Sequence, residues 1–216
     1  EEGQSFASGH VYVAPPDRHL IVGHGHVHVR RGPREHGSRP AIDSLFRSAA
    51  VNCTTRVIGV LLTGLLNDGT SGLQAIKRCG GLAVVQDPSD AAYDEMPRSA
   101  IRHVATDHVL PPEEISAGLL ALAREPRPPA GEVPGEIRAE ALIAAQELRG
   151  MDHLSRSGSI SPITCHEWHG SLQEIVDGEL VRYRCHTGHA FTLETLGAIQ
   201  AAEWERALYG AYRAQQ

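Results

Sequence analysis

The stretch Val57–Ile76, VIGVLLTGLLNDGTSGLQAI, carries a single carboxylate, that of Asp68, in a polar turn. The apolar run over 57–62 is typical of a strand covered on both faces, and the residues from Thr70 or Ser71 onward favour a helix capped by one of these hydroxyls. The carboxyl end of a buried strand is where α/β folds present catalytic side chains. Asp68 is therefore a candidate catalytic residue, and capping of the following helix is the alternative interpretation.

A second feature is a repeated Cys-x-x-x-His pattern whose two copies lie twenty residues apart. Zinc binds cysteine sulfur and histidine nitrogen and prefers four ligands in tetrahedral geometry. Strand-like segments over 172–176 and 180–184, joined by a turn, predict a hairpin that brings the two pairs together. His166 is an alternative to the first histidine of the pattern. A structural zinc site and a metal-free module both stay open, and the predicted ligands are Cys165, His169, Cys185 and His189.

The remaining histidines and cysteines favour simpler interpretations. Alternation in HGHVHV places His24, His26 and His28 on one face of a hairpin arm, where a solvated outer face is favoured over a metal site. Cys53 and Cys79 have no partner at ligand spacing and are expected to be inert thiols. Four cysteines in 216 residues do not form a disulfide framework, which favours a reducing cytoplasm.

The composition of the chain argues against several classes of protein and partner. The net charge of −6, without a long basic run, argues against nucleic acid as the main partner. Apolar content of 41% and charged content of 21% are ordinary for a soluble domain. No apolar run reaches about 18 residues, so no membrane insertion is expected. The first residues, EEGQSFASG, are polar and acidic and lack the layout of a signal peptide.

Hydrophobic periodicity predicts the elements that position these residues. The order strand, helix, strand around the Asp68 turn implies a right-handed parallel βαβ unit. A Pro- and Gly-rich segment over 124–136 is expected to be a linker. The predicted strands are 10–14, a hairpin over 20–29, 57–62, 82–86 and 104–110. The predicted helices are 41–50, one following Asp68, 98–103, 112–123, 137–150 and 192–213, the last with a packing stripe of Trp204, Leu208 and Tyr212.

Four phrases in unbroken order resemble the catalytic domain of the chemotaxis protein-glutamate methylesterase family, CheB. The phrases are GHVYVAPPDRHLIV, RPAIDSLFRSAA, VIGVLLTGLLNDGTSGLQAIKRCGG and VVQDPSDAAYDEMPRSAI, and they span about Gly9 to Leu120. The resemblance implies a doubly wound, mostly parallel α/β sheet. It also implies hydrolysis of γ-glutamyl methyl esters on methylated chemoreceptors or similar signalling proteins, with deamidation of glutamine in many members and no cofactor for catalysis.

The resemblance assigns a role to one residue of this chain. The family uses a Ser–His–Asp triad whose aspartate lies in the turn LTG-x-x-x-DG, so Asp68 is the implied triad acid. The family's serine and histidine precede the VYVAP phrase, and Ser5 and Ser8 are poor substitutes because no buried strand precedes them. The 216 residues alone are therefore expected to lack the first strands of the sheet and to be inactive.

The C-terminal part resembles a zinc-ribbon-like tail of some methylesterase-like proteins, in which a second cysteine stands where this chain has Trp168. The expected organisation is a truncated catalytic domain over 1–123, a linker over 124–136, and over 137–216 a helix, a small zinc-ribbon-like α+β module and a C-terminal helix. A non-catalytic adaptor derived from a methylesterase is the alternative function. A nucleotide-binding βαβ domain is disfavoured because no Gly-x-Gly-x-x-Gly follows a strand.

Overall fold

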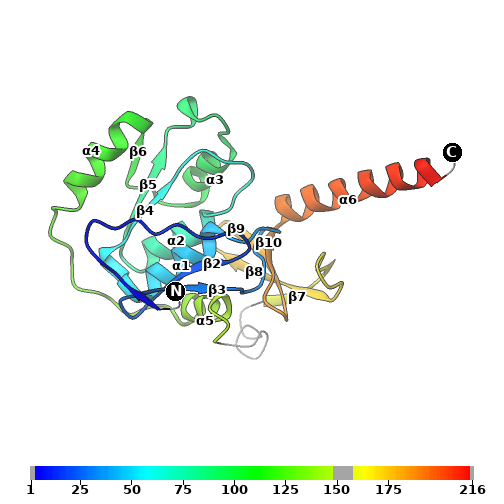
Figure 1. The fold of residues 1–216 in the computed structure, drawn as a ribbon, viewed down its shortest axis with the longest axis horizontal. Coiled ribbons are helices and arrows are strands. Elements are labelled where there is room, and N and C mark those ends of the chain that lie inside the picture. The colour runs from blue at the N-terminus through cyan, green and yellow to red at the C-terminus, as the bar shows by residue number, and fades with distance from the viewer. Residues whose placement is uncertain (1–2, 148–157, 215–216) are drawn as a thin grey trace.

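The computed structural model describes residues 3–147 and 158–214. Its centre is a parallel sheet of three strands, β4 (Ile58–Leu61), β5 (Leu82–Gln86) and β6 (His108–Leu110), in the order β4-β5-β6 (Figure 1). The parallel pairing and the helices between the strands confirm an α/β architecture. The last strand is shorter than the predicted 104–110 because α3 continues to His103 and a turn follows it.

Helices follow the strands in the expected order. They are α1 (Ile42–Cys53), α2 (Thr70–Arg78), α3 (Glu95–His103) and α4 (Pro112–Leu122). Leu73 and Ile76 of α2 are fully buried against Leu61 and Val85 of the sheet. This burial of aliphatic side chains, worth about 1.5–3 kcal/mol each, fixes α2 on the sheet and with it the start of the helix beside Asp68.

An antiparallel sheet precedes the parallel one. It contains β1 (Gln4–Ser5), β2 (His19–Gly23) and β3 (His26–Arg30), in the order β1-β3-β2. The hairpin predicted over 20–29 is confirmed. The strand predicted over 10–14 is wrong: this segment forms no ladder, and Val11 and Val13 are 89% and 80% exposed, so their alternation marks no buried face.

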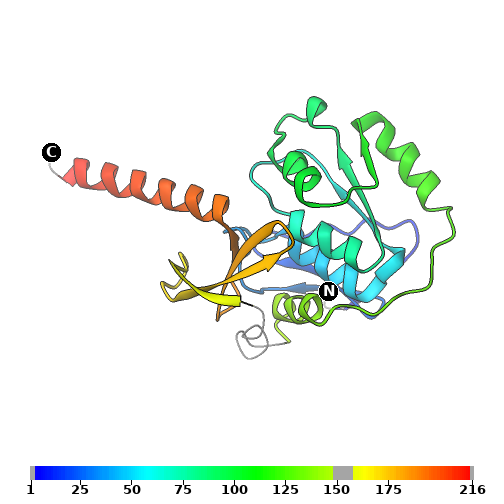
Figure 2. The ribbon, with the colours of Figure 1, turned by 180° about the vertical axis from the view of Figure 1, so that it is seen from behind.

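The C-terminal part adds α5 (Gly135–Ala144), a second antiparallel sheet and a long helix. The sheet has the order β10-β9-β8-β7, and α6 projects away from the body in both views (Figures 1 and 2). The bounds are β7 (Gly158–Thr164), β8 (Ser171–Asp177), β9 (Leu180–Cys185), β10 (Ala190–Thr192) and α6 (Leu193–Ala214). The predicted packing role of the α6 stripe is wrong, because Trp204, Leu208 and Tyr212 are mostly exposed. Residues 148–150 of the predicted helix 137–150 lie outside the described residues.

A buried ion cluster joins the C-terminal part to the α/β part. We use this name for Glu35, Arg47, Glu140, Arg182 and Arg184, all of which are buried. Arg182 of β9 donates two hydrogen bonds to Glu140 of α5, at 2.8 and 2.9 Å, and Arg184 donates to the same carboxylate at 2.8 Å. Arg47 of α1 pairs with Glu35, and its Nε lies 3.6 Å from Glu140. The cluster therefore links α1, α5 and β9.

The helices of the described residues include none with the length and apolar content needed to cross a bilayer.

Candidate functional site

Asp68 lies in the turn between β4 and α2, as the sequence predicts. Gly69, the next residue, has a φ of +90°, and a Cβ at this position would lie 2.5 Å from Leu61 and 2.9 Å from Ile42. Glycine is therefore required for both its backbone conformation and the close approach of its neighbours. The predicted hydroxyl cap of α2 is wrong, since Gly69 is the N-cap residue and Thr70 is already helical.

The carboxylate of Asp68 caps a helix, but that helix is α1 rather than α2. Its Oδ2 accepts a hydrogen bond from the Ile42 backbone N–H at 2.8 Å, and its Oδ1 accepts one from the Asp43 N–H at 3.1 Å. Both donors are unpaired groups of the first turn, where the helix dipole also favours negative charge. The side chain is half-buried and held in one orientation by these two contacts.

His36 and Asp43 lie beside Asp68 and complete a buried polar group. Each of the three residues has a ligand atom within 4.8 Å of the others. His36 Nε2 and Asp43 Oδ2 form a hydrogen bond of 2.9 Å, and Asp43 Oδ1 also accepts from the Gly72 N–H at 2.6 Å. His36 and Asp43 are not predicted from the sequence, because a loop histidine and a helix aspartate seven residues apart form no recognisable local pattern.

The charges of this group shift one another's ionisation. Burial and the neighbouring charge of Asp43 raise the pKa of Asp68 to about 6. Burial alone would raise the pKa of Asp43, but its hydrogen bond to His36 and the Arg47 charge lower it to about 2. Burial would lower the pKa of His36, yet the Asp43 hydrogen bond and charge outweigh it and raise that pKa. Asp68 is thus the carboxylate that titrates nearest neutral pH.

The C-terminal part contacts the turn directly. The amide of Asn67, adjacent to Asp68, donates to Thr192 Oγ1 at 2.7 Å and accepts from the Thr195 hydroxyl at 3.0 Å. The same Thr195 hydroxyl lies 3.2 Å from His36 Nδ1. Residues of β10 and the start of α6 therefore hold the position before Asp68. A hollow of about 330 Å³ opens next to this contact, lined by Leu66, Asn67, Glu95, Arg98, Ser99, Arg102, His103 and Glu194.

Comparison with known proteins identifies the region that contains this turn. The model of the family described as CheB methylesterase matches residues 1–119, more than half of the chain. This chain belongs to the CheB methylesterase family. The match includes the LTG-x-x-x-DG turn and Asp68, whereas the C-terminal part with its cysteines lies outside it.

Individual relatives agree with the family assignment. A putative protein-glutamate methylesterase/protein-glutamine glutaminase of Leptospira interrogans is 47% identical over 117 residues, which cover 54% of this chain and 61% of that protein. A protein-glutamate methylesterase/protein-glutamine glutaminase of Anaeromyxobacter dehalogenans is 40% identical over 122 residues, 56% of this chain and 36% of that protein. The chain thus spans less than two thirds of the length of these relatives.

A solved structure supports the fold. The crystal structure of the Thermotoga maritima CheB methylesterase catalytic domain superimposes with a TM-score of 0.54 at 33% sequence identity, covering 56% of this chain and 67% of that one. The CheB-like fold of the α/β part is therefore shown.

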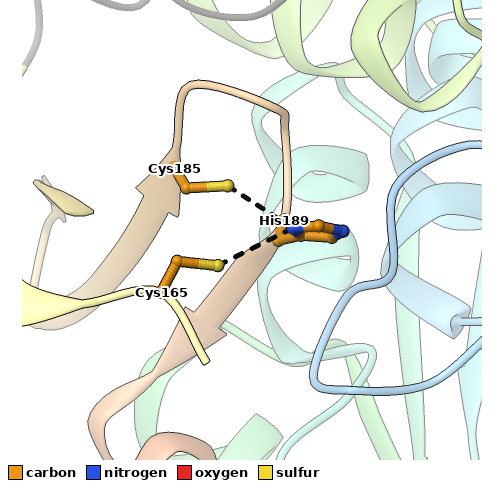
Figure 3. Close-up of side chains that lie close together, drawn as sticks. All are labelled: Cys165, Cys185 and His189. Carbon is orange, nitrogen blue, oxygen red and sulfur yellow. Dashed lines mark hydrogen bonds between the residues drawn. The ribbon is translucent and has the colours of Figure 1, made fainter. Parts of the chain in front are cut away.

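The second candidate site lies in the C-terminal sheet, outside the CheB match. Cys165 follows β7, Cys185 ends β9, and His189 precedes β10, and all three side chains point toward one another (Figure 3). His189 Nδ1 lies 3.7 Å from Cys165 Sγ and 3.5 Å from Cys185 Sγ. Both cysteines are buried and free of disulfides. The fold thus brings together three of the four predicted ligands.

Burial and neighbouring groups shift the ionisation of the two cysteines. Backbone hydrogen bonds of Glu167 and Trp168 act to lower the pKa of Cys165, and one of Thr187 acts to lower that of Cys185. Burial and the nearby Cys185 raise the pKa of Cys165 to about 11. Burial would also raise the pKa of Cys185, but hydrogen bonds from His189 and Thr187 lower it to about 6. The surroundings of Cys185 therefore favour its thiolate, the form of cysteine that binds metals, whereas those of Cys165 favour the neutral thiol in the absence of a metal.

The fourth predicted ligand, His169, is not part of this group. Its side chain is exposed, its φ is +67°, and it is absent from the set of ligand atoms that lie within 4.8 Å of one another. Its alternative, His166, instead pairs with Glu203 of α6 at 3.0 Å. The Cys-x-x-x-His repeat correctly located the two turns, but the first turn directs its histidines elsewhere.

Proposed function

We propose that this chain is the Asp68-bearing part of a protein-glutamate methylesterase that acts in the cytoplasm on methylated chemoreceptors or similar signalling proteins. The observation that carries the proposal is the position of Asp68. Its carboxylate is oriented at the carboxyl end of β4, within the region that matches the CheB methylesterase family. Relatives of this region are named protein-glutamate methylesterase/protein-glutamine glutaminase, which supports ester hydrolysis and glutamine deamidation as the reaction types.

In this proposal Asp68 is the acid of a Ser–His–Asp triad. A histidine takes the serine proton as the ester carbonyl is attacked, and the carboxylate holds that imidazole in the right tautomer and stabilises its charged form. Two N–H groups of α1 keep the carboxylate fixed, so it need not reorient during the reaction. Methanol leaves, water attacks the acyl-enzyme, and a glutamate side chain is restored.

The test measures methanol release from methylated receptor by the whole product of the gene that encodes this chain. Asp68→Asn should lower turnover by roughly 10⁴-fold, because an amide favours the wrong histidine tautomer. The matched control is Asp90→Asn, an exposed carboxylate in the same matched region, which should leave turnover unchanged. Turnover of the Asp68 variant within a few-fold of the unmodified protein would remove this residue from the triad. Activity absent from the unmodified protein would instead favour the adaptor function.

We also propose that residues 158–192 form a zinc-ribbon-like module that binds a metal ion. Its support is the convergence of Cys165, Cys185 and His189 from two turns at the ends of antiparallel strands. Zinc accepts this sulfur and nitrogen donor set. Metal analysis of the full chain, purified without chelators, should find close to one equivalent of zinc, and less than about a tenth of an equivalent would overturn this part of the proposal.

A further inference from the structure

We propose that Cys165, Cys185 and His189 hold the metal with three protein ligands and leave its fourth coordination position to a small exogenous donor. This inference rests on the proposed zinc binding and goes beyond it, because structural zinc sites normally close all four positions with side chains. A three-ligand site has an exchangeable position, which is the property of zinc centres that bind or activate a small molecule.

The ligand count is the first observation. The three donor atoms lie within 4.8 Å of one another, and within residues 3–147 and 158–214 no further Cys, His, Asp or Glu joins them. The nearest histidines along the chain are committed to other contacts. His166 pairs with Glu203, while the ring of His186 packs on Trp168 with their centroids 3.7 Å apart.

The exposure of a neighbouring residue is the second observation. Thr187 is exposed, and its hydroxyl oxygen lies 2.9 Å from Cys185 Sγ and 3.2 Å from His189 Nδ1. The two cysteines are buried, so the ligand group meets solvent at the residue that carries this hydroxyl. A donor that enters there can hydrogen-bond to this hydroxyl as it binds the metal.

Charge defines the class of the exogenous donor. Zinc carries two positive charges, and two thiolates with one neutral imidazole balance them, so the three-ligand complex is neutral. A neutral centre does not select strongly for anions. Water is therefore the expected resident ligand, and small nitrogen donors such as imidazole are expected to replace it.

The experiment uses the full chain loaded with Co²⁺, which reports its coordination through visible absorption. One equivalent should bind with a thiolate charge-transfer band, and Cys165→Ser, Cys185→Ser and His189→Ala should each abolish stoichiometric binding. Cys53→Ser is the matched control, because this half-buried thiol lies in α1 and should not change binding. Imidazole should then produce a saturable shift of the visible bands that dialysis reverses.

A parallel titration of the His169→Ala variant separates the alternatives. An open position predicts the same imidazole response in this variant and in the unmodified chain. A response that appears only in the variant would overturn the inference and identify His169 as the fourth ligand. Bound cobalt without any response in either protein would show a closed site and overturn the inference, while zinc binding would stand. No bound metal would overturn both, without bearing on the proposed role of Asp68.

Discussion

The ion cluster gives a sharp test of how the C-terminal part is attached. In Glu140→Gln the side chain keeps its size but loses the charge that faces Arg182 and Arg184 at 2.8–2.9 Å and Arg47 at 3.6 Å. Arg47 and Arg184 would then share the carboxylate of Glu35. The remaining carboxylates are more distant, with Asp177 3.6 Å from Arg182 and Asp43 3.8 Å from Arg47. Removing one partner from a buried ion pair costs about 3–5 kcal/mol, because the remaining charges stay buried without compensation.

The expected loss is large enough to measure directly. For a chain of this size each kcal/mol corresponds to about 2–4 °C, so the midpoint of thermal unfolding should fall by roughly 6–20 °C. Asp94→Asn is the matched control, since this exposed carboxylate pairs with Arg98 on the surface of α3, where such pairs contribute about 0–1 kcal/mol. Both tryptophans, Trp168 and Trp204, belong to the C-terminal part, so their fluorescence follows that part while circular dichroism follows the whole chain.

The pH dependence of this contribution has a defined sign. Burial would raise the pKa of Glu140, but the charges of Arg182, Arg184 and Arg47 outweigh it and hold that pKa well below its ordinary value. A lowered carboxyl pKa stabilises the fold above about pH 4.5, and this stabilisation is lost as the pH falls through the folded-state value. A loss below about 1 kcal/mol in Glu140→Gln at pH 7 would refute the reasoning, because the cluster would then not hold the two parts together.

Two further predictions concern the surroundings of Asp68. In Asp43→Asn the pKa of His36 should fall from its raised value, because the Asp43 charge is lost while burial remains and only the charges of Asp68 and Glu35 still raise it. Histidine NMR titration measures this, and a His36 pKa equal to that of the unmodified chain would contradict it. Gly69→Ala should lower the free energy of unfolding by more than about 1 kcal/mol, since alanine is strained at a φ of +90°. Gly131→Ala, where a Cβ would meet no atom within 4 Å, is the control in denaturant unfolding, and equal losses in both variants would contradict the strain argument.

The sequence correctly predicts those elements in which the spacing of apolar residues along the segment indicates the buried face. The strands β4 and β5 and the helices α1, α2 and α4 lie where the apolar spacing places them. The segment 10–14 fails because alternation describes only one side of a strand, and a ladder also needs a neighbouring strand with free backbone groups. The stripe Trp204, Leu208 and Tyr212 fails for a related reason: its spacing predicts a helix with an apolar face but does not say whether another element covers that face.

The candidate sites also contain features that the sequence predicts and features that depend on contacts between distant segments. Asp68 and the cysteine-containing turns are predictable because their chemistry is carried by short motifs. The partnership of Asp68 with His36 and Asp43 is not, because it depends on α1 directing its first turn at a carboxylate 25 and 26 residues later in the chain. The sequence also does not show that both histidines of the first turn lie outside the ligand group, since this depends on the pairing of His166 with Glu203 and on the backbone conformation of His169 at a φ of +67°.

The two candidate sites are connected through one continuous segment. The proposed metal-binding loop 185–189 is preceded by Arg184, which is anchored in the ion cluster. It is followed by Thr192, which is hydrogen-bonded to Asn67 beside Asp68. A metal that links this loop to β7 restricts the segment between its two anchors. Because the second anchor holds the residue next to the proposed catalytic carboxylate, binding of metal in the C-terminal module should tighten the Asp68 turn through contacts within this chain alone.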